Sequence, residues 1–146
     1  KNNLEELQNF EEDYTITIVF TDGEYEQNVQ VVVEGETATI SEVDGDWTEE
    51  FDISGTIDTE NLMYALPFLV LEMDDLDKDG NLEEDKIVEF IQRMFPEDES
   101  EEIATEIAEM TIEYTFEFDG GVLVGFTFSL TEEEMDVTVV ATIEYN

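Results

Sequence analysis

The acidic segment 75–86 is the part of the chain whose residue types and spacing could do chemistry. Carboxylate and amide oxygens are the ligands that hard cations such as calcium and magnesium prefer. Carboxylates at alternate positions converge on one cation, and Gly80 permits the tight turn that this convergence needs. We therefore predict a site for a hard cation. Its candidate ligands are Asp75, Asp77, Asp79, Asn81, Glu83, Glu84 and Asp85.

The order Asp-x-Asp-x-Asp-Gly-x-Leu over 75–82 resembles the calcium-binding loop of the EF-hand family. The resemblance implies an entering helix that ends near Met73 and an exiting helix that begins after the loop. It departs at position twelve, where the family has a bidentate Glu and this chain has Lys86. Because the Lys ammonium competes with the cation, we expect weak calcium binding. The alternative is a solvated acidic turn that its own Asp side chains cap.

A second stretch, residues 50–61 around Gly55, has similar spacing. Its first and twelfth positions, Glu50 and Asn61, are poor ligands. Only one helix fits between Gly55 and Gly80, too little for two hands. We interpret this stretch as a strand end followed by a helix cap rather than as a metal site.

The composition excludes most other functions. Lys and Arg number 4 against 42 Asp and Glu, so the formal net charge is −38, and His and Cys are absent. Nucleic acids and anionic membranes need a basic face. Catalytic triads, thiol nucleophiles and His/Cys zinc sites need the missing residues. We therefore predict no catalytic residues and a protein that is not an enzyme.

The charge also bears on environment and partners. Carboxylates at this density repel one another unless molar salt screens them, divalent cations bind them or a basic protein partner covers them. The near absence of Lys resembles proteins of halophiles that accumulate salt in their cytoplasm. The chain starts at Lys1 without Met, and we expect a mature domain from a processed precursor, located outside the cell or on its surface. The cytoplasm of such a halophile is the alternative location.

Residue periodicity predicts the elements that must position the acidic loop. Alternating apolar and polar residues predict seven strands, with links too short for helical crossovers, so the strands should be antiparallel. Helical spacing predicts a short helix near the N-terminus, a helix over 58–73 kinked at Pro67, and two further helices after the loop. The strands are predicted over 14–20, 25–33, 37–43, 48–53, 112–118, 122–128 and 137–145.

We therefore predict a single α+β domain over residues 1–146. Its antiparallel sheet consists of two meanders, of about four and three strands, with an insert of two to three helices packed on one face. The first part, 1–57, holds the N-terminal helix and meander. The insert with the acidic loop spans 58–110, and the second meander spans 111–146.

Two functions from different classes follow from these features. The first is a non-enzymatic calcium-binding domain whose metal stabilises the helical insert by mass action. The second is a carrier of an apolar ligand, because the order of elements resembles bacterial lipoprotein-carrier domains, whose curved half-barrel holds acyl chains under helices. The aromatic side of the last strands would line that cavity or form a filled core. A third reading is that the charge serves only solubility in salt.

Overall fold

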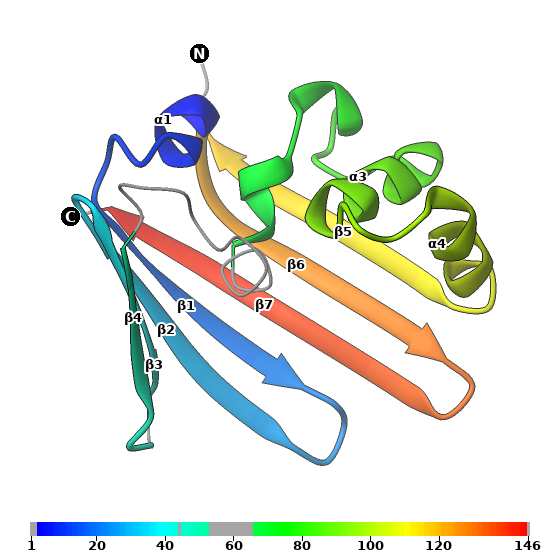
Figure 1. Ribbon diagram of the computed structural model, residues 1–146, viewed down its shortest axis with the longest axis horizontal. Coiled ribbons are helices and arrows are strands. Elements are labelled where there is room, and N and C mark those ends of the chain that lie inside the picture. Colours follow the sequence, from blue (N-terminus) through cyan, green and yellow to red (C-terminus); the bar gives the residue numbers. More distant parts are fainter. Residues whose placement is uncertain (1–2, 44, 53–65, 146) are drawn as a thin grey trace.

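Seven antiparallel strands form one curved sheet in the computed structural model, which describes residues 3–43, 45–52 and 66–145 (Figure 1). Their order across the sheet is β4-β3-β2-β1-β7-β6-β5, so β4 and β5 are the edges. Antiparallel pairing of β1 with β7 joins the two meanders, with Ile16 opposite Ile143. The strands are β1 (Tyr14–Thr21), β2 (Glu26–Glu34), β3 (Thr37–Glu42), β4 (Thr48–Asp52), β5 (Thr111–Asp119), β6 (Val122–Glu132) and β7 (Met135–Tyr145).

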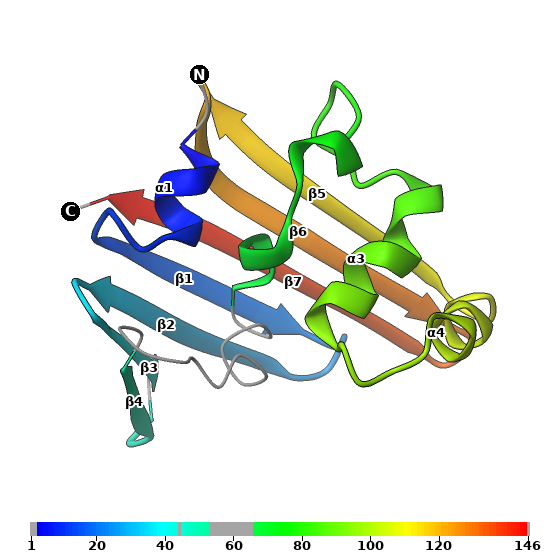
Figure 2. The same ribbon diagram turned by 45° about the horizontal axis from the view of Figure 1, so that its top comes forward.

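The helical segments are short and lie on the same side of the sheet (Figure 2). None among the described residues is long and apolar enough to cross a membrane. The α-helices are α1 (Leu4–Gln8), α3 (Ile87–Met94) and α4 (Ser100–Ile107). Three single turns of 3-10 helix accompany them: η1 (Pro67–Val70), η2 (Met73–Asp75) and η3 (Glu84–Lys86).

The predicted α+β class is wrong for this molecule, which is mainly β. Strand and bridge residues make up 48% of the described chain and helical residues 24%. The largest difference lies before the acidic loop. The part of the predicted 58–73 helix that the structure describes is η1, an extended link and η2, since Pro67 starts a 3-10 turn and Leu71 and Glu72 are extended. Leu66, Phe68 and Leu71 are buried there without forming an α-helix.

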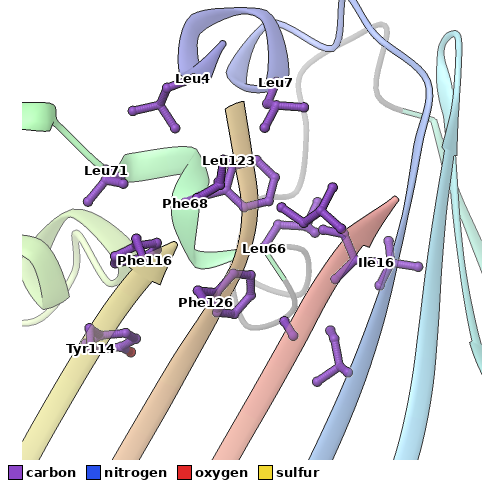
Figure 3. Close-up of a cluster of buried hydrophobic side chains, with 14 of the residues drawn as sticks. Leu4, Leu7, Ile16, Leu66, Phe68, Leu71, Tyr114, Phe116, Leu123 and Phe126 are labelled. Atoms are coloured by element: carbon purple, nitrogen blue, oxygen red, sulfur yellow. The ribbon is translucent and has the colours of Figure 1, made fainter. Parts of the chain in front are cut away.

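The core lies between the sheet and these segments. Side chains on one face of a strand recur at every second residue, and Tyr114 and Phe116 of β5 are buried in this way. Phe90 of α3 packs edge-on against both rings, with centroids 5.0 and 6.2 Å apart. Phe68 of η1 contacts β1 and β6 through rings whose centroids lie 6.0 and 6.4 Å away. Figure 3 shows Phe68 surrounded by α1, β6 and neighbouring core residues.

Amide side chains fasten the N-terminal segment to this core. Gln8 donates from Nε2 to the carbonyls of Phe68 and Leu71, at 2.9 and 2.8 Å. Buried Asn3 accepts from the N–H of Leu123 at 2.8 Å and donates to the hydroxyl of Tyr145 at 2.9 Å. These bonds satisfy polar groups that would otherwise be buried without partners. They also place α1 against η1 at one end of the sheet.

Candidate functional site: the acidic loop and the groove beside it

The acidic loop forms a small hairpin that pairs with the edge strand β5. Leu76 bridges Leu82 across the hairpin, and Asn81 bridges Thr115 of β5. The N–H of Leu82 donates to the carbonyl of Tyr114 at 2.8 Å, and the N–H of Phe116 donates to the carbonyl of Gly80 at 2.7 Å. The loop therefore covers part of a sheet edge whose backbone groups would otherwise be open to solvent.

Asp75, the first predicted ligand, turns into the protein instead of toward the loop. It is only 2% exposed, and its Oδ2 accepts from Nη2 of Arg93 in α3 at 2.5 Å. Nη1 of Arg93 donates to the carbonyl of Val70 at 2.6 Å. The N–H of Glu72 also donates to Asp75 at 3.2 Å. This carboxylate therefore links η2 to α3 and is already paired with a cation.

Asp77, the second predicted ligand, stabilises the turn of the loop. Its Oδ1 accepts from the N–H of Asn81 at 3.0 Å and of Asp79 at 2.9 Å. The bond from the Asn81 backbone is the main cause of a lowered pKa at Asp77, which remains fully exposed. Gly80 closes the turn at φ +86°, a conformation that suits glycine.

The remaining predicted ligands lie around this hairpin and the start of η3. Asn81 accepts from the Thr115 hydroxyl at 2.7 Å. The structure brings no three acidic side chains of its described residues into an arrangement that could hold a metal ion. Calcium binding there stays a prediction. Exposed acidic side chains at the other positions are Asp79, Glu83, Glu84 and Asp85.

The structure also shows where Lys86 and the two segments that flank the acidic loop lie. Lys86, at the twelfth position, ends η3 and makes a long ion pair of 3.9 Å with Glu89. The exiting helix that the EF-hand resemblance implies is α3, but the entering segment is a 3-10 turn. The second stretch, 50–61, lies mostly outside the described residues.

Beside the hairpin, an open groove of about 730 Å³ separates α3 and α4 from the edge of β5. Most residues of its walls are apolar: Ile87 and Val88 come from α3, and Ile107 comes from α4. Tyr114 of β5 lies between them, and burial raises its pKa far above the ordinary value, so its hydroxyl stays neutral. The other lining residues are Asn81, Leu82, Glu84, Ala104, Ala108, Met110, Thr111, Ile112 and Glu113.

Acidic residues are part of the lining of the groove and lie next to it. Glu84 and Glu113 line it directly. A shallower hollow that shares Ala108, Met110 and Thr111 with it is lined also by Glu109, Glu132 and Glu133. No Lys or Arg of the described chain lines either depression. The site is therefore an apolar groove in a negative field.

We did not predict this groove from the sequence. Its signal is present in α4, where Ala104 and Ala108 lie one turn apart beside Ile107 and are exposed. Small apolar residues on the solvent side of a helix leave a depression that larger side chains would fill.

Comparisons with protein-family models, with curated proteins and with solved structures find no match.

Proposed function

We propose that this chain is a non-enzymatic binding protein that holds an apolar ligand in the groove between α3, α4 and β5. The observation that carries the proposal is the groove itself, which is lined mostly by apolar residues and is about 730 Å³ in volume. Sites for small ligands are concave, mostly apolar and roughly 300–1,000 Å³ in size. The groove therefore has the size and lining of a binding site.

Two of its walls, α3 and β5, are held in place independently of a ligand. Phe90 packs α3 onto β5, and the pair Arg93–Asp75 joins the same helix to η2. The other wall, β5, is hydrogen-bonded to β6 along its length. A preformed site loses less conformational entropy when it binds its ligand than a site that must first assemble.

The absence of His and Cys supports binding rather than catalysis. Apart from the carboxylates, Tyr114 is the ionisable side chain among the lining residues. Its hydroxyl stays protonated near neutral pH. Tyr114 therefore offers the groove contact area and a neutral hydroxyl rather than an ionised oxygen.

Binding of a neutral apolar dye, Nile red, tests the proposal. In the variant Ala104→Trp the indole fills the groove from α4, and we expect at least a tenfold loss of affinity for the dye. The matched control is Thr105→Trp, which adds the same side chain at the next, exposed position of the helix, outside the groove. Equal dye binding by the two variants would rule the groove out as the site.

A further inference from the structure

The edge strand β5 is only partly covered by the acidic hairpin. Glu83 directs its N–H across the hairpin to the carbonyl of Asp75 at 3.0 Å, and the pairing with β5 ends at Leu82 because Glu84, the next residue in register to face β5, begins η3. From there the chain enters η3 and leaves the sheet edge. The beginning of β5, around Ile112, therefore continues past the end of the hairpin.

The hydrogen bonds to the hairpin show which backbone groups of β5 face outward. The carbonyl of Tyr114 and the N–H of Phe116 both point to the hairpin. In an antiparallel strand the outward-facing residues recur at every second position. The pairing of β5 with β6 keeps one register from Thr111 to Glu117, so Ile112 faces outward too. Among the described residues, none forms a hydrogen bond to its N–H or carbonyl at this edge.

The groove follows this open edge. Four consecutive residues of β5, from Thr111 to Tyr114, line it. Because neighbouring side chains of a strand point to opposite faces, a cavity that touches all four must run along the edge rather than over one face. On the helix side it meets Ile87 and Ile107, and on the other side it meets Glu113.

We propose that the occupant of the groove is an extended peptide segment with alternating apolar and basic residues, which adds a short strand to β5 at Ile112. The inference rests on the proposed function and specifies its ligand. The peptide backbone pairs with the open N–H and carbonyl of Ile112, as in recognition by strand addition. Its apolar side chains enter between α3 and α4, and its basic side chains lie toward Glu113.

Charge selects this occupant over the others that an apolar groove could take. The chain carries a formal charge of −38, and the lining of the groove includes the carboxylates of Glu84 and Glu113. A second copy of the chain and anionic lipids are repelled. A basic peptide is attracted, and its backbone can form hydrogen bonds with the open N–H and carbonyl of Ile112 at the edge of β5.

Peptides of one composition and different order provide the test. A labelled hexapeptide of alternating Lys and Val is compared with its block isomer, in which three Lys precede three Val. Binding is measured in about 1 M NaCl, where the Debye length is about 3 Å and unspecific charge attraction is weak. We expect the alternating peptide to bind about tenfold more tightly, because only its order sends apolar and basic side chains to opposite faces.

Backbone pairing is tested separately with two N-methylated forms of the alternating peptide. Each form is methylated at every second amide, in one of the two registers. The register that faces β5 should lose about tenfold in affinity, and the other should bind like the parent. Hydrogen exchange at Ile112 should slow when the peptide binds, while exchange at Glu113, whose N–H faces β6, should not change.

The variant Ile112→Pro removes the outward N–H and is compared with Ile112→Val, which keeps it. Proline is tolerated at edge positions whose N–H faces solvent. We expect weaker peptide binding by the proline variant only. If that variant does not fold, the two methylated peptides decide the question on the unaltered protein.

The outcomes separate this inference from the proposed function. Equal binding of both isomers and of both methylated registers would overturn strand addition. If Nile red binding is lost in Ala104→Trp but no peptide displaces the dye, the groove is an apolar site with another occupant, and this inference fails alone. If neither dye nor peptide depends on the groove, both proposals fail.

Discussion

Arg93 donates from Nη2 to Oδ2 of Asp75 at 2.5 Å, and Asp75 is 2% exposed. Arg93 is the only arginine of the chain. Its guanidinium also lies 6.0 Å from the centre of the Phe90 ring. The guanidinium of Arg93 thus joins α3 to η2. Without it, the buried carboxylate of Asp75 would have no positive partner, which would cost free energy of folding.

The variant Arg93→Met should destabilise the fold by about 2–3 kcal/mol. Breaking a buried pair leaves an unpaired charge and costs roughly 3–5 kcal/mol, reduced here because Arg93 is partly exposed. Urea unfolding measures the change. The control is Lys86→Met, which removes the same charge from an exposed pair and should cost less than about 0.5 kcal/mol. Equal losses of unfolding free energy in the two variants would mean that the change depends on net charge and not on the buried pair.

The variant Gly80→Ala should detach the hairpin from β5. A Cβ at Gly80 would lie 2.1 Å from the carbonyl oxygen of Phe116, and the residue has φ +86°. We expect a loss of stability above about 2 kcal/mol. Gly23→Ala is the matched control, since Gly23 has φ +98° with no atom within 4 Å and should lose only about 1 kcal/mol. Similar losses in the two variants would show that the contact with Phe116 is unimportant.

The carboxylate of Asp77 should stabilise the loop in a pH-dependent way. Its pKa is lowered in the folded state by the backbone N–H of Asn81, so its contribution is present above the ordinary pKa and is lost as pH falls through the folded-state value. The stability difference between the wild type and Asp77→Asn should therefore shrink on acidification. Asp79→Asn controls for the removal of one charge from the same turn. A difference that stays constant down to pH 2 would contradict the expectation.

Calcium and sodium should affect stability through different terms. Sodium chloride should raise Tm, because the Debye length falls from about 10 Å at 0.1 M to about 3 Å at 1 M. At constant ionic strength we expect calcium to add little, since Asp75 is already paired with Arg93. A calcium-specific rise in Tm that Asp79→Asn removes would instead support the calcium function predicted from the sequence.

Two tyrosines near the N-terminal segment should respond differently to loss of the hydroxyl. The Tyr14 hydroxyl is buried and has no hydrogen-bond partner in the part of the chain that is described. Tyr14→Phe should be neutral or stabilise by up to about 1 kcal/mol. Tyr145 donates to the carbonyl of Leu123 and accepts from Asn3, so Tyr145→Phe should cost about 1–2 kcal/mol. Thermal unfolding of both variants measures these changes, and a larger cost at Tyr14 would contradict them.

The positions of the strands follow from the sequence, because a period of two is a local property. The alternation that includes Tyr114 and Phe116, for example, coincides with β5. The helix predicted over 58–73 was wrong in the part that the structure describes, residues 66–73, and the reason is not local. An apolar run such as 66–71 can be buried as a 3-10 turn or as an α-helix. Which of the two forms depends on how the run packs against the sheet.

For the site, the sequence by itself determined that carboxylates gather around a turn at Gly80 and that the chain has no His or Cys. The tertiary structure decided what those carboxylates do. Asp75 meets a cation 18 residues later, and Asn81 meets Thr115, which is 34 residues away. The groove likewise needs α3, α4 and β5 together. Contacts between distant residues depend on how the elements pack, and no local spacing encodes that packing.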